Sequence, residues 1–262
     1  MSARVAIVVF PGSNSEEETL RAARQAGMDA TLVHWDVRDL DRFDAYILPG
    51  GFAYEDRVRA GAIAAHDRIL DAVIDGALMG KLVLGICNGA QILLEAGLIP
   101  GTGEVRRPTA AFTHNAPSRR FICRHVHVKL AIAPQRCAIT AHLPEGAVLP
   151  AWAAHAEGRL AAHPDDLERL TAGQHIAFVY AQADGTTDAR AVPNGSALGA
   201  AALCNAAGNV LGIMPHPERD AWMFQRRDGP ERLSAQGRAS AMLAPCGGFA
   251  IFTSFARGLR LS

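Results

Sequence analysis

The chain has no excess of charge of either sign. Among its 262 residues, 26 lysines and arginines balance 26 aspartates and glutamates, so the formal net charge is zero. It therefore lacks the basic surface of a general nucleic-acid-binding protein and the polybasic segment of a membrane-surface protein. The apolar run at residues 5–11 is too short for a signal peptide or a membrane span. We expect a cytoplasmic protein that binds neither nucleic acid nor membranes.

Paired cysteines and phosphate-binding loops are also missing. No CxxC pair occurs, and the five cysteines are an odd number at wide spacings, which indicates neither a zinc site nor a disulfide framework. The glycine-containing stretch at residues 12–15 matches neither G-x-G-x-x-G nor G-x-x-x-x-G-K, so we expect no nucleotide site there. His125 and His127 alternate on a probable strand, but without a third ligand nearby a metal site is the less favoured interpretation.

What is present is a globular composition, with 49% apolar and 20% charged residues, and an alternation of strands and helices. Continuous apolar runs predict buried strands at residues 5–10, 30–35, 45–48 and 81–87. Polar capping residues, closing glycines and apolar residues on one face predict helices at 13–27, 58–76 and 88–96. This order predicts a doubly wound α/β fold, with a mostly parallel sheet flanked by helices.

The pattern changes after residue 101. Residues 102–120 and 220–246 are predicted as loop insertions, and 249–259 as a final helix. Strands are predicted at 121–132, 138–149, 175–180, 200–203 and 210–214, the first ones antiparallel. Because no repeat or linker interrupts the chain, residues 1–262 are predicted to form one domain.

A nucleophile candidate lies between the predicted strand 81–87 and the helix after it. Gly85-Ile-Cys87-Asn-Gly89 has the form of a nucleophile elbow, in which a tight turn projects the side chain at the carboxyl end of the sheet. The following helix N-terminus favours the thiolate, and the N–H of Asn88 would face an oxyanion. The alternative is a buried, inert cysteine in a turn flanked by glycines.

A thiol nucleophile needs a base, and the base needs an orienting group. His216 lies at the end of another apolar strand, between two prolines, and Glu218 points the same way if the segment is extended. A rigid turn with solvated side chains is the alternative. His155 and Glu157 repeat this spacing, but no parallel strand precedes them, so nothing is expected to place them beside Cys87.

A second glycine turn, Gly50-Gly51, ends the strand 45–48 and should emerge at the same sheet edge as the cysteine. Its backbone N–H groups could complete an oxyanion hole. An ordinary strand-to-loop turn is the simpler interpretation of this segment alone.

Two of these segments together, Gly85-Ile-Cys-Asn-Gly-Ala-Gln91 and Pro215-His-Pro-Glu218, resemble the triad class of glutamine amidotransferases. Within that class the chain is more similar to the glutaminase subunits of phosphoribosylformylglycinamidine synthases. The similarity lies in residues 11–14, 50–52, 59–62, 121–124, 193–196 and 212–219. It implies a flavodoxin-like class I glutamine amidotransferase architecture.

The resemblance also implies roles for the candidate residues. Cys87 would attack the side-chain amide of glutamine and form a γ-glutamyl thioester. His216 would act as base and acid, oriented by Glu218. Backbone N–H groups of Gly50 or Gly51 and of Asn88 would hold the oxyanion, and Gln91 would help hold the glutamine.

The ammonia would pass to a separate synthetase subunit, which uses ATP to convert formylglycinamide ribonucleotide to formylglycinamidine ribonucleotide in purine biosynthesis. A small bridging subunit is the other implied partner. The ATP and magnesium sites would belong to the synthetase, so no cofactor or metal is expected in this chain.

Three positions depart from the family pattern. Ser15 stands where Cys or Thr is usual, Glu55 where Gly is usual, and Ala90 where a large aromatic residue is usual. Ala90 could enlarge the space behind the elbow, and Glu55 could alter the loop near the glutamine pocket. Two alternatives remain: a different elbow-cysteine hydrolase, and a non-catalytic binding module on the same fold.

Overall fold

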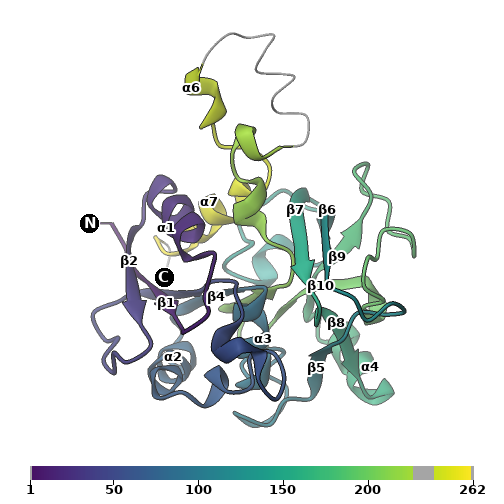
Figure 1. Cartoon of the computed structure of the whole chain (residues 1–262), viewed down its shortest axis with the longest axis horizontal. Coiled ribbons are helices and arrows are strands. Elements are labelled where there is room, and N and C mark those ends of the chain that lie inside the picture. The colour runs from purple at the N-terminus through teal and green to yellow at the C-terminus, as the bar shows by residue number, and fades with distance from the viewer. Residues whose placement is uncertain (1, 227–238, 261–262) are drawn as a thin grey trace.

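The computed structural model describes residues 2–226 and 239–260 of the chain (Figure 1). A nine-stranded sheet has the order β2-β1-β3-β4-β11-β10-β9-β6-β7, and β5 and β8 form a separate two-stranded sheet. The strands are β1 (Arg4–Val9), β2 (Asp29–His34), β3 (Ala45–Leu48), β4 (Leu82–Ile86), β5 (Ala110–Thr113), β6 (Ile122–Leu130), β7 (Val148–His155), β8 (Arg159–Ala162), β9 (Ile176–Ala181), β10 (Ala200–Cys204) and β11 (Val210–Ile213).

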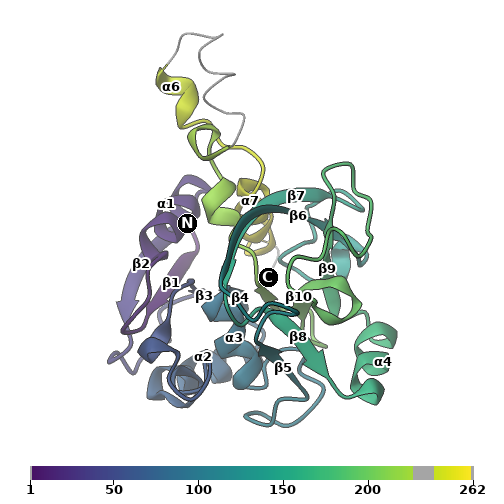
Figure 2. The same ribbon diagram turned by 45° about the vertical axis from the view of Figure 1, so that its right-hand side comes forward.

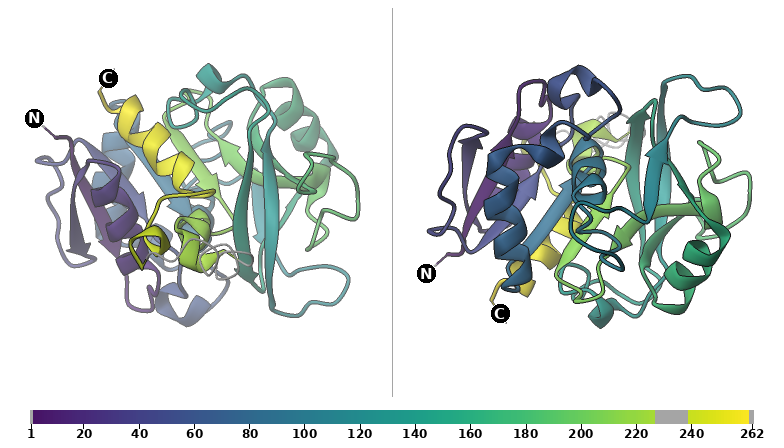
Figure 3. Two further views of the ribbon diagram at one scale, coloured as in Figure 1. Left: turned by 90° about the horizontal axis from the view of Figure 1, so that it is seen from above. Right: turned by 90° about the horizontal axis from the view of Figure 1, so that it is seen from below.

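The first five strands in this order run parallel. Strands β3, β4 and β11 are buried at every residue, as expected where helices cover both faces of a parallel sheet. Helices α1 and α7 lie on one face and α2 and α3 on the other (Figure 3). The helices are α1 (Glu16–Gln25), α2 (Arg68–Leu78), α3 (Asn88–Glu95), α4 (Pro164–Ala172), α6 (Ala239–Met242) and α7 (Phe249–Gly258). The predicted α/β class with antiparallel additions is confirmed.

The antiparallel half of the sheet curls back on the parallel half. Strands β6 and β7 curve over as one ribbon (Figure 2). The backbone of Trp152 in β7 then exchanges two hydrogen bonds with that of His216, which follows β11, at N···O distances of 2.8 and 3.1 Å. The last strand in the order therefore returns to the carboxyl edge of the parallel strands, and this half almost closes into a barrel.

Several predicted boundaries were wrong, for local reasons. Residues 138–147 form turns and irregular backbone, and the strand begins only at Val148 as β7, whose Pro150 and three alanines are weak strand signals. The predicted loop 102–120 contains β5, and β8 and α4 were missed. Val58 has a φ of +73° and is not helical, and the helix expected from it begins only at Arg68, where Asp67 is extended and its side chain accepts from the N–H of Ile69 as the N-cap.

The second predicted insertion begins as ordered structure. The side chain of Trp222 is buried, and its indole N–H donates to Oε1 of Gln25 on α1 at 2.6 Å. Residues 227–238 of this segment lie outside the described residues. Of the helices that the structure describes, none has the length and apolar character needed to cross a membrane.

Candidate active site

Cys87 occupies a strained turn between β4 and α3. Its φ of 50° and ψ of −106° are unusual for a residue with a side chain. A Cβ on Gly85 would lie 2.6 Å from the carbonyl oxygen of Gly89, and one on Gly89 would lie 2.0 Å from that of Leu48. Both glycines are therefore required by close backbone approach, and the predicted strand–turn–helix setting of the cysteine is confirmed.

His216 and Glu218 follow β11, the parallel neighbour of β4. Nδ1 of His216 lies 2.5 Å from Oε1 of Glu218, and both side chains are buried. Burial disfavours the imidazolium, but the charges of Glu218 and Cys87 and hydrogen bonds to both outweigh it and raise the pKa of His216 to about 10. The structure thus brings all three predicted side chains together, with the imidazole between the cysteine sulfur and the glutamate carboxyl group.

The end of β7 forms a third side of the site. Sγ of Cys87 lies 3.7 Å from the carbonyl oxygen of Ala154, and Nε2 of Gln91 donates to the carbonyl oxygen of Glu157 at 2.6 Å. The expectation that nothing places the His155–Glu157 segment beside Cys87 was therefore wrong. The curled half-barrel brings this strand back to the elbow, although no parallel strand precedes it.

His155 is nevertheless poorly suited to be the base. The side-chain amide of Asn115 donates to two carbonyl groups, which leaves its Oδ1 to accept from Nδ1 of His155 at 3.1 Å. Burial, and then the positive charge of His216, lower the pKa of His155 to about 3. A neutral imidazole of such low basicity is a weak proton acceptor, so His216 is the better-matched base.

The second glycine turn lies against the triad. A Cβ on Gly50 would lie 2.4 Å from Cε1 of His216, so only glycine fits. Oδ1 of Asn88 accepts from the N–H of Ala53 at 3.0 Å and fixes this loop to the elbow. The N–H of Gly51 has no acceptor among the described residues. The N–H of Asn88, the first residue of α3, has none within its helix.

Gln91 is held at both ends of its side chain. Its Oε1 accepts from Nδ2 of Asn88 at 2.9 Å, while its Nε2 donates to the carbonyl oxygen of Glu157, two residues after the end of β7. The side chain therefore braces the elbow against the segment that follows β7. Its contact with glutamine stays a prediction.

Acidic groups lie beside this brace. Nδ2 of Asn88 donates to Oδ1 of Asp56 at 3.2 Å. Burial and the charge of Glu157 raise the pKa of Asp56 to about 6, against the opposing effect of that hydrogen bond. Oε1 of Glu157 lies 3.7 Å from Nδ1 of His114. Two carboxyl groups, those of Asp56 and Glu157, thus lie on the polar rim beside Gln91.

The structure shows the surroundings of the three residues that depart from the family pattern. Glu55 has a φ of 58°, the left-handed conformation that the usual glycine adopts freely. Ala90 is fully buried, and a Cβ on Gly212 would lie 3.1 Å from its Cβ and 2.3 Å from Cδ1 of Ile99. The space behind the elbow is therefore packed. Oγ of Ser15 is buried without a hydrogen-bond partner in the described structure.

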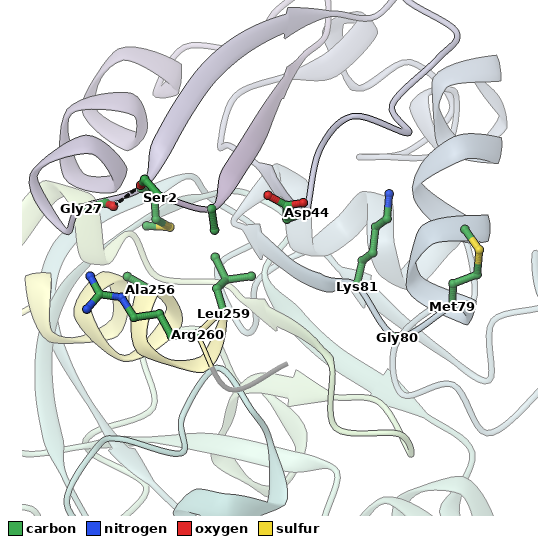
Figure 4. Close-up of a pocket in the computed structure, with 11 residues that line it drawn as sticks. Ser2, Gly27, Asp44, Met79, Gly80, Lys81, Ala256, Leu259 and Arg260 are labelled. Atoms are coloured by element: carbon green, nitrogen blue, oxygen red, sulfur yellow. Dashed lines mark hydrogen bonds between the residues drawn. The ribbon is translucent and has the colours of Figure 1, made fainter.

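No group of three or more histidine, cysteine, aspartate or glutamate side chains that could hold a metal ion occurs among the described residues. A cavity of about 1140 Å³ lies elsewhere (Figure 4). Its lining residues Asp44 and Lys81 come immediately before β3 and β4, so it opens at the amino edge of the sheet, opposite Cys87.

Comparison with known proteins identifies the family. Residues 2–245 match the CobB/CobQ-like glutamine amidotransferase domain. The chain is 44% identical over 233 residues to phosphoribosylformylglycinamidine synthase subunit PurQ of Thermomicrobium roseum, covering 88% of this chain and 94% of that protein. The PurQ subunit of Pyrococcus furiosus is 42% identical over 221 residues, or 84% and 91% of the two chains. The chain belongs to the PurQ family.

A solved structure of PurLQS from Thermotoga maritima matches with 30% identity and a TM-score of 0.75, over 99% of this chain and all of that one. The glutaminase domain of Trypanosoma brucei CTPS matches over 100% of this chain and 95% of that one with 13% identity and a TM-score of 0.55, and so shares the fold. The resemblance on which the sequence prediction depended is confirmed.

Proposed function

We propose that this chain is the glutaminase subunit of a phosphoribosylformylglycinamidine synthase. It hydrolyses L-glutamine to glutamate and ammonia, and the ammonia converts formylglycinamide ribonucleotide to formylglycinamidine ribonucleotide in purine biosynthesis. Membership of the PurQ family supports the reaction and the substrate. The observation that carries the mechanism is the convergence of Cys87, His216 and Glu218 at one sheet edge.

The first half of the proposed reaction forms a thioester. The Cys87 thiolate attacks the side-chain amide carbon of glutamine, and the N–H groups of Gly51 and Asn88 stabilise the resulting oxyanion. The His216 imidazolium then gives its proton to the amide nitrogen, the C–N bond breaks, and ammonia leaves. Gly50 keeps the loop close enough to His216 for these groups to act together.

Hydrolysis completes the cycle. Neutral His216 removes a proton from water, the hydroxide attacks the γ-glutamyl thioester, and the C–S bond breaks to give glutamate and the thiolate. Glu218 holds the imidazole by its Nδ1–H and stabilises its charged form. Gln91 ties the elbow to the segment after β7, and the carboxyl groups of Asp56 and Glu157 suit the α-ammonium group of glutamine.

The remaining reactants belong to other chains in this proposal. ATP and magnesium bind a synthetase partner, and a small bridging subunit joins the complex, in line with the match to a PurLQS structure. This chain contributes one glutamine amidotransferase domain, needs no cofactor of its own, and acts in the cytoplasm.

Cys87→Ser tests the mechanism in a complex with the synthetase and the bridging subunit. We expect glutamine-dependent synthesis to be lost and ammonia-dependent synthesis to be kept. Cys123→Ser is the matched control, because Cys123 is exposed on β6 and outside the triad. An electrophilic glutamine analogue should label the wild type and Cys123→Ser but leave Cys87→Ser unlabelled. Glutamine-dependent synthesis that survives Cys87→Ser would refute the mechanism, and absence of labelling in the wild-type complex would favour a non-catalytic module.

A further inference from the structure

A second histidine–carboxylate pair lies next to the triad. Nε2 of His125 on β6 is 2.6 Å from Oδ2 of Asp220. Asp220 is the last residue of the short 3₁₀ turn η5 (Pro217–Asp220), the same turn that contains Glu218. The pair therefore ties the turn that holds the orienting carboxylate to the antiparallel half of the sheet.

Asp220 depends strongly on this partner. The residue is fully buried, and its other oxygen, Oδ1, has no hydrogen-bond partner among the described residues. A buried carboxylate is costly unless it is paired and hydrogen-bonded. His125 supplies the ion pair recorded for Asp220, so loss of its donor would leave a buried charge in the turn that holds Glu218.

His125 also contacts β7, the strand whose backbone is hydrogen-bonded to His216. Its ring packs edge-on against the ring of Trp152, with centroids 5.7 Å apart at 80°. The backbone of Trp152 is the group that exchanges two hydrogen bonds with His216. One side chain thus bears on both His216, through Trp152, and Glu218, through Asp220.

We propose that His125 and Asp220 are positioning residues that keep Glu218 in line with Nδ1 of His216 during glutamine hydrolysis. The inference rests on the proposed glutaminase function. Because small misplacements of a catalytic group can cost about 100-fold in rate, loss of the His125 donor should lower kcat about 10- to 100-fold. KM should change little, since the pair is not part of the proposed glutamine contacts.

Two amide substitutions make the test specific. The side-chain nitrogen of His125→Gln can reach the place of Nε2, whereas that of His125→Asn is too short to reach Asp220. In the reconstituted complex we expect His125→Gln to keep kcat within about threefold of wild type, and His125→Asn to lose the stated factor. The His216 imidazole should also titrate at lower pH in His125→Asn, because Glu218 is no longer held against it.

His163→Asn is the control, since His163, at the N-cap of α4, forms an exposed pair with Asp165 at 3.7 Å. Equal kcat in the Gln and Asn variants, or an equal loss in both, would overturn the positioning role. If the wild-type complex itself fails to hydrolyse glutamine, or Cys87→Ser still does so, the proposed function fails instead. Suppose instead that the wild type is active, Cys87→Ser is inactive, and His125→Gln and His125→Asn have equal kcat. This result refutes the positioning role alone.

Discussion

The charge of Glu218 should hold His216 in its protonated form well above neutral pH. The pKa of His216 rises from 6.5 to about 10 although burial opposes the charge. At about 1.36 kcal/mol per pKa unit, the net rise corresponds to roughly 5 kcal/mol in favour of the imidazolium. Glu218→Gln keeps the size of the side chain and removes its charge. An opposite charge at this range accounts for about 1 to 3 pKa units, so the midpoint should fall to about 7–9.

The titration can be followed by NMR on protein labelled at histidine Cε1. The resonance of His216 is the one missing from a His216→Asn variant. In the wild type it should stay in the protonated form until about pH 10. Cys87→Ser should also lower the midpoint, because the thiolate charge is lost. Glu157→Gln is the matched control, since Glu157 is not among the groups that shift His216.

The free energy of unfolding should also depend on pH through the titration of His216. The pKa of His216 is higher in the folded protein than its unfolded value of about 6.5, so its contribution is complete below about pH 6.5 and is lost as the pH rises through about 10. Glu218→Gln should therefore reduce the free energy of unfolding at pH 6 and have less effect above pH 10. A Glu218→Gln midpoint equal to that of wild type, or a wild-type midpoint near 6.5, would refute this electrostatic account.

Three further substitutions probe the backbone around the triad. Gly50→Ala places a Cβ 2.4 Å from the His216 ring and should cost about 100-fold in glutaminase kcat with the fold retained, a result that unchanged kcat would contradict. Gly89→Ala meets a backbone carbonyl of β3 at 2.0 Å and should lower the free energy of urea unfolding by about 1–3 kcal/mol, so an unshifted midpoint would oppose it. Asn88→Ala removes the hydrogen bond that lowers the pKa of Asp56, so this carboxyl should titrate above about pH 6 by NMR, and a lower value would rule out that assignment.

The parallel half of the fold could be predicted because its signals are local. Strands β3 and β4 are continuous apolar runs that end in glycine turns, and parallel strands share one carboxyl edge. Cys87 and the Gly50 turn therefore had to meet at that edge. His216 joined them for the same reason, since its strand is also a fully apolar run.

The antiparallel half carries weaker signals. Strand β7 contains Pro150 and three alanines, and only its length and pairing with β6 reveal it as a strand. The sequence offered the H-x-E spacing at His155 as a pointer to this region. What could not be deduced was its distance from the elbow, because strand curvature is set by packing across the whole sheet rather than by any short segment.

The closing strand explains why the two halves of the sheet are both needed for the chemistry. The parallel strands bring the thiol, the imidazole and the glycine turn to one edge, but an open edge would leave the orientations of these groups unconstrained. The carbonyl oxygen of Ala154 in β7 lies 3.7 Å from Sγ of Cys87, and the backbone of Trp152 in β7 pairs with that of His216. Because these contacts come from one continuous strand, a shift of β7 would move the nucleophile and the base together. Substitutions of buried residues of β6 such as Val128, which pack this strand while it holds β7 along its whole length, should therefore affect the reaction without touching glutamine.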